Sequence, residues 1–350
     1  MINSVSIQNF KILEKLENVP LSKITLFGGK NNTGKTTILE ALFLYFDFNT
    51  PEVFDKLFSW REFSGIWAPN EVGNKFFHDT DLTKEVIITT DSGKTENGQL
   101  KIGFLENYET PVQIADVEYG VTTFKKNFPA FEIVFTLNNS IDYLAHILCL
   151  KTNRNYLREI NKLQGQPEIF YMGERMKLYV KNHEYLGVLD KTDEQEKILP
   201  LLRLFEPNLK CLQLINDSGN NVIYADFGNR KKIPVNMLGD GFCRCLTIAL
   251  VLATKNAKIF LIDEVGSGIH YSMQEDIWIF LTKASELYDC QIIATTHSHD
   301  TIKAFNNIVD GGNESYFSYI RLEKGKDSIK THIFTPELLK YSLSSKLELR

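Results

Sequence analysis

Residues 24–37 have the sequence ITLFGGKNNTGKTT, and the glycine-rich part of this stretch decides the fold. Gly29–Thr36 match the phosphate-loop pattern GxxxxGK[ST] at every fixed position. Ile24–Phe27 fit a strand that is buried on both faces, and Thr36–Phe46 have apolar side chains at helical spacing. The order strand, glycine loop, helix predicts an α/β fold built around a phosphate site.

The residue types in this loop suit a phosphate ligand. Glycines let backbone N–H groups turn inward, and the N-terminus of the following helix adds positive potential. Lys35 is predicted to reach the terminal phosphates of a nucleoside triphosphate, and the Thr36 hydroxyl to ligate Mg²⁺. The predicted nucleotide-binding residues of the loop are Gly29, Lys30, Asn31, Asn32, Thr33, Gly34, Lys35, Thr36 and Thr37.

A second apolar run ends in two carboxylates, in the sequence KIFLIDE at residues 258–264. A strand buried on both faces cannot hold charges, so Asp263 and Glu264 are expected at its C-terminal edge, where α/β sheets bind ligands. Asp263 is predicted to hold the Mg²⁺ ion with its water shell. Glu264 is predicted to orient and deprotonate the water that attacks the γ-phosphate. Taken alone, the segment equally fits a helix cap at a strand exit.

A third apolar run, QIIATTH at residues 291–297, ends in a histidine. His297 is predicted to hydrogen-bond the γ-phosphate and to report whether it is present. A rival interpretation joins His297, His299 and Asp300 into a metal site. This interpretation is disfavoured, because the three residues share one short turn and the sequence offers no second ligand cluster.

Composition narrows the class of protein. The 350 residues are 43% hydrophobic and 24% charged, which is ordinary for a soluble globular protein. The net charge of −5 gives no general attraction to nucleic acid, so DNA contact would need a local basic patch. Five cysteines without a CxxC pair argue against a zinc ribbon. Without a signal-peptide pattern or a long apolar stretch, the sequence predicts a cytoplasmic protein without membrane contact.

The remaining pattern predicts a mostly parallel core sheet with an antiparallel β annex and a helical insert. Residues 85–137 have strand-like patterning, and residues 140–163 have apolar residues at helical spacing. We expect a single head over residues 1–350. It would consist of a lobe with the phosphate loop and β annex (1–139), a helical insert or connector (140–205), and a lobe with the acidic strand end and the histidine (206–350). Further expected elements are a strand at 168–171, helices at 193–204, 239–253 and 273–287, a hairpin of 210–215 with 222–227, and a final β-pair of 316–322 with 328–334.

The phosphate loop, LIDE, ATTHS and the segment MLGDGFCR (Met237–Arg244) together resemble the ABC-type ATPases of the RecF, SMC and OLD group. Within that group the sequence is most similar to the small OLD-like, AAA-family ATPases of bacterial DNA-repair and anti-phage defence systems. The resemblance covers nearly the whole chain. It implies an ABC-type P-loop NTPase fold, with ATP and Mg²⁺ as cofactors and ATP hydrolysis as the activity.

The resemblance also implies a homodimer or higher homo-oligomer with two ATP molecules between head-to-tail heads. One head would supply the phosphate loop and the carboxylates, and the other a signature loop of Gly239, Asp240 and Gly241. This loop lacks the family-typical serine, and a carboxylate at Asp240 is unfavourable near a γ-phosphate unless it points away. Arg244, one turn on, is a candidate compensating cation. Residues 266–270 fall at the dimer joint of the family.

Relatives of the OLD type often have a C-terminal Toprim nuclease domain, for which the residues after the last β-pair leave too little length. We therefore expect an ATP-driven switch that controls a separate effector, a nuclease or toxin. One alternative is an ATP-dependent scaffold that recognises double-stranded DNA or a phage protein with little turnover. A transporter ATPase subunit is a less favoured alternative, because the signature is irregular and the insert at 85–137 is rich in β-structure.

Overall fold

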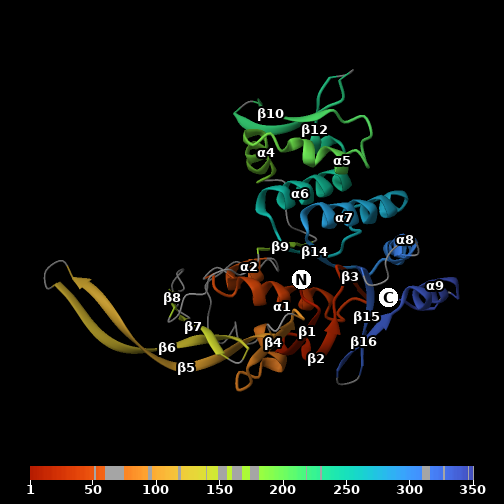
Figure 1. The fold of residues 1–350 in the computed structure, drawn as a ribbon. Coiled ribbons are helices and arrows are strands. Elements are labelled where there is room, and N and C mark those ends of the chain that lie inside the picture. Colours follow the sequence, from red (N-terminus) through yellow and green to blue (C-terminus); the bar gives the residue numbers. More distant parts are fainter. Residues whose placement is uncertain are drawn as a thin grey trace.

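The described residues of the computed structural model form two large β-sheets and a small three-stranded sheet (Figure 1). The structure describes residues 1–50, 53–59, 75–93, 97–116, 120–138, 140–148, 156–159, 168–173, 181–217, 219–228, 231–309, 316–325, 328–345 and 347–349. The first sheet forms the core of the head, and the second is the antiparallel annex that the sequence predicts.

The core sheet has six strands in the order β16-β15-β3-β14-β13-β9. All neighbouring strands in it are parallel except β15 and β16, which form an antiparallel pair. Its three central strands are completely buried, as predicted for strands covered on both faces. The strands are β3 (Ile24–Gly29), β9 (Ile169–Met172), β13 (Ile259–Ile262), β14 (Gln291–Thr295), β15 (Phe317–Lys324) and β16 (Ile329–Phe334).

The annex is an antiparallel sheet in the order β2-β1-β4-β5-β6-β7-β8. Its central hairpin, β5 and β6, is much longer than the predicted strands, and its outer part extends away from the head as a two-stranded ribbon (Figure 1). The strands are β1 (Ser4–Phe10), β2 (Leu13–Pro20), β4 (Val86–Asp91), β5 (Asn97–Asp116), β6 (Gly120–Leu137), β7 (Ser140–Leu148) and β8 (Tyr156–Glu159).

The helix predicted at residues 140–163 is wrong wherever the structure describes this segment. Ser140–Leu148 and Tyr156–Glu159 are strands that extend the annex beyond β6. Residues 149–155 and 160–167 lie outside the described part of the chain. Asn138, with φ of 50°, begins the turn that returns the chain along β6. Within the described residues, the 140–205 segment is therefore β-structured at 140–148, 156–159 and 169–172, and helical from α4 (Asn182–Lys191) onward.

The helices cover the core sheet from both sides.

The predicted helix at 193–204 is replaced by two short pieces, a 3₁₀ turn at Gln195–Lys197 and α5. The helices are α1 (Lys35–Asp47), α2 (Val53–Ser59), α4 (Asn182–Lys191), α5 (Leu199–Leu202), α6 (Asp240–Lys255), α7 (Gln274–Tyr288), α8 (His299–Val309) and α9 (Pro336–Ser344). The predicted hairpin is present as β10 (Cys211–Asp217) and β11 (Asn220–Asp226). A third strand, β12 (Ile233–Pro234), pairs with β11. None of the helices within the described residues is long and apolar enough to cross a bilayer.

The hydrophobic residues form two clusters, one on each face of the core sheet. Because neighbouring side chains on a strand point to opposite faces, Phe27 belongs to the cluster with α1 and the annex. Leu26 belongs to the cluster with α6 and α7. The core sheet is thus held between two apolar layers. Polar side chains of β3, β13 and β14 can reach solvent only at the strand ends, and this confinement positions the site.

Candidate nucleotide-binding site

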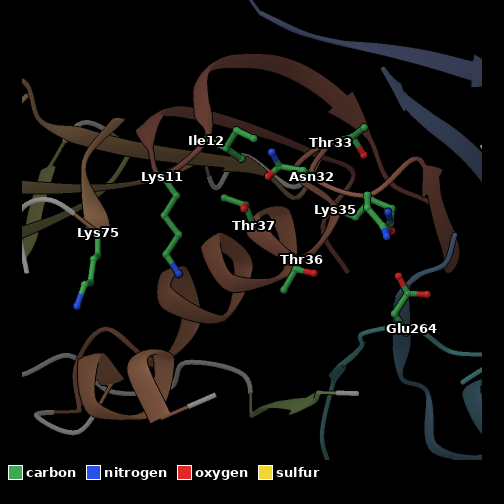
Figure 2. A pocket seen from close by; sticks show the side chains of 11 residues that line it. Lys11, Ile12, Asn32, Thr33, Lys35, Thr36, Thr37, Lys75 and Glu264 are labelled. Carbon is green, nitrogen blue, oxygen red and sulfur yellow. The ribbon is translucent and has the colours of Figure 1, made fainter. Parts of the chain in front are cut away.

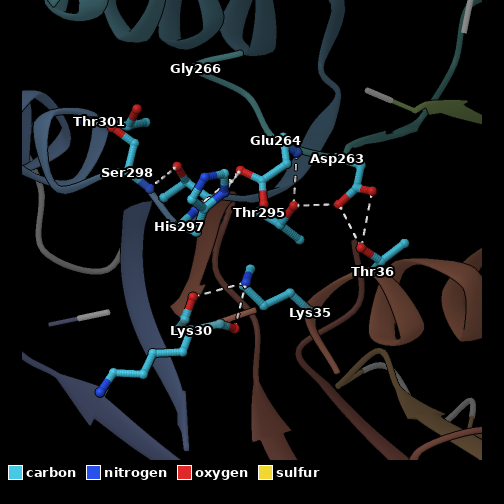
Figure 3. A network of polar contacts seen from close by, with 12 residues as sticks. Lys30, Lys35, Thr36, Asp263, Glu264, Gly266, Thr295, His297, Ser298 and Thr301 are labelled. Atoms are coloured by element: carbon cyan, nitrogen blue, oxygen red, sulfur yellow. Dashed lines mark hydrogen bonds and ion pairs between the residues drawn. The ribbon is translucent and has the colours of Figure 1, made fainter. Parts of the chain in front are cut away.

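The C-terminal ends of β3, β13 and β14 bring the predicted phosphate, metal and catalytic residues together. These strands are parallel neighbours, so their C-terminal ends lie at one edge of the sheet. Figure 3 shows the side chains that converge there from the phosphate loop, from the end of β13 and from the segment after β14. The labelled predicted residues in this network are Lys30, Lys35, Thr36, Asp263, Glu264 and His297.

The phosphate loop has the backbone conformation that its glycines allow. Gly29 has φ of 144° and Gly34 has φ of 91°, both in the region that favours glycine. A Cβ atom on Gly29 would lie 2.6 Å from the backbone oxygen of Leu322 in β15, so the loop passes close against the neighbouring strand. Gly34 then caps the N-terminus of α1. The loop thus presents a helix N-terminus to the site, as an anion requires.

Lys35 lies across the loop, and only 5% of it is exposed. Its Nζ donates hydrogen bonds to the backbone oxygens of Gly29 and Lys30, each at 2.9 Å. Burial lowers the pKa of Lys35, and the nearby carboxylates of Glu264 and Asp263 oppose this shift. A buried ammonium between these carboxylates is suited to a phosphate, which would add negative charge beside it.

Asp263 accepts hydrogen bonds from two threonine hydroxyls. Thr36 Oγ1 lies 3.0 and 3.1 Å from the two carboxylate oxygens, and Thr295 Oγ1 lies 2.6 Å from Oδ1. Burial raises the pKa of Asp263, although both threonine hydrogen bonds oppose the rise. Mg²⁺ takes oxygen ligands and is commonly held by one or two carboxylates plus substrate phosphates. A carboxylate and a hydroxyl in contact beside the phosphate loop fit such an ion.

Glu264 is held by His297. His297 Nδ1 lies 2.8 Å from Glu264 Oε2, and the His297 backbone N–H donates to the same oxygen at 3.2 Å. The backbone N–H of Glu264 donates to Thr295 Oγ1 at 2.9 Å. Glu264 itself has φ of 50°, a left-handed conformation that is unusual for a glutamate. Such strain is typical of functional sites, where the surrounding contacts fix the residue.

Thr295 is a site residue that the sequence did not single out. Its hydroxyl donates to Asp263 and accepts from Glu264, so one side chain fixes the relative position of the two carboxylates. Thr295 is fully buried at the end of β14. The signal was available, because the ATTHS motif places a threonine two residues before His297. Only the parallel pairing of β13 with β14 shows that it faces Asp263.

A cavity of about 440 Å³ lies in front of the loop (Figure 2). Its walls extend beyond the motif residues to Lys11, Ile12 and Lys75. Lys11 also forms an ion pair of 2.8 Å with the buried Glu40 of α1. Lys11 follows β1, so the annex sheet contributes directly to the cavity. The lining residues are Lys11, Ile12, Asn31, Asn32, Thr33, Gly34, Lys35, Thr36, Thr37, Lys75 and Glu264.

The predicted signature residues Gly239, Asp240 and Gly241 lie at the start of α6 and do not line this cavity. Gly239 and Asp240 are exposed, and Gly241 is partly buried. A Cβ atom on Gly268 would lie 3.7 Å from the Cβ atom of Asp240, so the loop after Glu264 lies beside this helix start. Arg244, in α6, reaches the end of β13 in the same chain, where its Nη2 donates to the backbone oxygen of Asp263 at 2.9 Å. The signature loop thus forms a surface of its own, separate from the phosphate loop of the same chain.

The rival metal site gains no support. Among the residues that the structure describes, no group of three or more His, Cys, Asp or Glu side chains is arranged to hold a metal ion. His299 and Asp300 lie in the first turn of α8, whereas His297 turns to Glu264.

Known proteins resemble this chain in sequence and in fold. Residues 24–302 match the family described as "AAA domain, putative AbiEii toxin, Type IV TA system". An ATP/GTP phosphatase of Helicobacter pylori (strain ATCC 700392 / 26695) is 23% identical in an alignment of 343 residues, and the match covers 88% of this chain and 88% of that protein. A crystal structure of an SMC head bound to the C-winged helix domain of ScpA covers 95% of this chain and 97% of that chain, with a TM-score of 0.51 and 13% identity. The fold is that of an ABC-type P-loop NTPase head.

Proposed function

The chain belongs to this AAA-domain family, and from that membership and the site geometry we propose that it is a Mg²⁺-dependent ATPase that acts as a molecular switch. The observation that carries the proposal is the contact of Thr36 and Asp263 beside Glu264 at the mouth of the phosphate-loop cavity. These groups have the types and the arrangement that phosphoryl transfer to water requires. The name of the Helicobacter pylori relative, ATP/GTP phosphatase, is consistent with this chemistry.

In the proposed reaction, the loop amides and Lys35 hold the β- and γ-phosphates. Thr36 and Asp263 would hold Mg²⁺, which would neutralise charge that develops on the phosphate oxygens. Glu264 accepts a proton from a water molecule as the water oxygen bonds to the γ-phosphorus. The bond from that phosphorus to the bridging oxygen breaks, and ADP and phosphate leave. His297 keeps Glu264 oriented through Nδ1, so Nε2 is the ring nitrogen left to reach the γ-phosphate.

The switch would operate between two or more copies of the chain. Gly239 and Asp240 are exposed and Gly241 is partly buried at a helix N-terminus, where a phosphate of a nucleotide bound by another copy can be received. Closure on ATP and opening after hydrolysis would then hold or release an effector, a nuclease or toxin, in DNA repair or anti-phage defence. The OLD-like character belongs to this part of the proposal.

One observation favours a second candidate, an ATP-dependent scaffold with little turnover. Asp240 is exposed in the first turn of α6, where its carboxylate would stand near the γ-phosphate of a partner head. Like charges at close range raise the energy of a closed, ATP-bound dimer. The scaffold would bind ATP through the phosphate loop and recognise double-stranded DNA or a phage protein.

Steady-state ATP hydrolysis separates the two candidates. The rate is measured with Mg²⁺ or with EDTA, with and without double-stranded DNA, for the wild type and Lys35→Ala. The switch predicts a Mg²⁺-dependent rate that Lys35→Ala abolishes. Stimulation by DNA would identify the trigger as DNA, and an unchanged rate would point to a protein trigger. A wild-type rate equal to that of Lys35→Ala, with ATP still bound, would reject the switch and select the scaffold.

A further inference from the structure

A buried glutamine outside the cavity holds the loop that follows Glu264. Gln274 is the first residue of α7 and is only 5% exposed. Its Nε2 donates to the backbone oxygens of Gly266 at 3.2 Å and Ile269 at 3.0 Å. Its Oε1 accepts from Thr301 Oγ1 at 2.9 Å. Three hydrogen bonds fix the side-chain amide in one orientation, and they join the loop to α8.

Thr301 connects this amide to the segment that contains His297. Its backbone N–H donates to Ser298 Oγ at 3.3 Å, and the Ser298 N–H donates to Thr296 Oγ1 at 3.0 Å. Its backbone oxygen accepts from the indole N–H of Trp278 at 3.1 Å. Thr301 is completely buried, so these contacts are protected from water. Figure 3 shows Thr301 and Ser298 beside His297, on the side away from the phosphate loop.

The contacts close a ring around Glu264. On one side, the Glu264 carboxylate is held by His297. On the other side, the backbone oxygen of Glu264 accepts from the Ser267 backbone N–H at 3.0 Å, within the turn that Gln274 holds. A Cβ atom on Gly266 would lie 2.2 Å from Thr301 Oγ1 and 2.8 Å from Gln274 Oε1, so the turn is tightly packed against both side chains. A shift of the turn therefore has to displace Gln274 or Thr301.

We propose that Gln274 is a positioning residue for Glu264, which it aligns with the attacking water by tying the Gly266–Ile269 turn to Thr301. The inference rests on the proposed hydrolytic function. Gln274 is not among the residues that line the cavity, so it acts through Glu264 and His297. Misplacing a catalytic group by about 1 Å can cost roughly 100-fold in rate, whereas nucleotide affinity depends mainly on the phosphate loop.

The test uses Gln274→Leu, which keeps the side-chain volume but removes all three hydrogen bonds. We expect kcat to fall by about tenfold or more, with the Kd for ATP within about twofold of wild type. Thr301→Val is the second variant, because it removes only the hydroxyl contact with Gln274 and leaves the shape intact. If Gln274→Leu fails to fold, Thr301→Val is measured in its place. A wild-type kcat in either folded variant overturns the proposal.

Two matched controls separate positioning from general destabilisation. Gln291 is also a buried glutamine, 1% exposed, and its amide bonds to the backbone of Ile2 and Ser22 at the opposite end of β14. Gln291→Leu is expected to lower the Tm while it leaves kcat unchanged. Thr282→Val removes a comparable threonine hydrogen bond inside α7 and is expected to do the same. Equal losses of kcat in variants and controls would contradict a positioning role.

Glu264→Gln distinguishes failure of this inference from failure of the proposed function. If Glu264→Gln loses activity, adding Gln274→Leu to it should cause no further loss, because both changes act on the same proton transfer. A further, multiplicative loss would overturn the inference and leave the function intact. If Glu264→Gln itself keeps the wild-type kcat, the proposed role of Glu264 fails, and the positioning role of Gln274 fails with it.

Discussion

At the scale of single residues, the site contains buried charges and a strained backbone, which lower the stability of the folded protein unless a ligand is bound. Asp263 is buried with its pKa raised by desolvation, and Lys35 is buried with its pKa lowered by the same cause. Glu264 keeps a left-handed backbone with φ of 50°. Each of these features destabilises the folded chain by itself, and together they describe a site preorganised for phosphate and a divalent cation.

Asp263→Asn should therefore stabilise the protein when Mg²⁺ is absent. Because the folded-state pKa is raised above the usual 3.8, the folded protein binds the proton more tightly than the unfolded chain. The contribution of Asp263 to stability is then lost as pH rises through the raised pKa. We expect Asp263→Asn to have a higher Tm than wild type at about pH 8. The corresponding gain in the free energy of unfolding should be on the order of 1 kcal/mol. The gain should shrink as the pH falls towards 3.8.

Calorimetry in EDTA across this pH range measures the Tm of the wild type and of Asp263→Asn. Asp240→Asn is the control, because its carboxylate is exposed in the first turn of α6 and should change stability by no more than about 0.5 kcal/mol. A lower Tm for Asp263→Asn at all pH values would mean that the hydrogen bonds from Thr36 and Thr295 outweigh the burial cost.

At the scale of elements, the phosphate loop depends on β15 as much as on its own sequence. A Cβ atom on Gly29 would lie 2.6 Å from the backbone oxygen of Leu322, which cannot move aside without disturbing the sheet. We expect Gly29→Ala to weaken ATP binding by at least about tenfold, as measured by calorimetric titration. Gly187→Ala is the matched control, since its site in α4 is open and alanine favours helix by about 0.5–1 kcal/mol. Unchanged ATP affinity in Gly29→Ala would show that the loop adapts.

The sequence was informative where local pattern and tertiary structure agree. The runs that became β3, β13 and β14 are apolar; the first leads into the phosphate loop and the other two into polar residues. Their parallel pairing was therefore expected to gather Lys35, Asp263 and His297 at one edge. The region 140–148 shows the opposite case. Ile141, Leu144, Ile147 and Leu148 fit helical spacing, yet Tyr143 and Ala145 are buried on either side of the partly buried Leu144, as alternation in a strand requires. Ile141 is 61% exposed, because a register shift separates its pairing with Thr136 from that of Tyr143 with Phe135.

Long-range contacts account for the rest of what the sequence did not predict. Lys11, Ile12 and Lys75 reach the cavity because the annex packs beside α1, and no local motif marks them. The length of the β5–β6 ribbon was also missed, because residues 105–128 lack a continuous alternation and a bulge falls between Leu105 and Tyr108. The buried amide of Gln274 is invisible in the sequence for the same reason.

At the scale of the whole molecule, the proposed switch needs a second copy of the chain to complete the site. Met237 and Tyr271 are 74% and 71% exposed, and they flank the start of α6 and the loop after Glu264. In the proposed dimer, the contact between the heads would cover both side chains. We expect Glu264→Gln to form a dimer with ATP and Mg²⁺ in light-scattering chromatography, and Met237→Lys or Tyr271→Glu to prevent it. Ile333→Glu, at a 52% exposed position in β16, should leave the dimer intact. If dimers still form with Met237→Lys and with Tyr271→Glu, the contact between the two copies lies elsewhere.

The central claim is that Glu264 deprotonates the attacking water in a site that binds nucleotide through other residues. A single-turnover experiment tests it most directly, by mixing excess protein with radiolabelled ATP and Mg²⁺ and measuring both bound ATP and released phosphate. For Glu264→Gln the account predicts ATP binding equal to wild type and phosphate release slower by a factor on the order of 100 to 10,000. Phosphate release at the wild-type rate, with ATP bound normally, would contradict the claim.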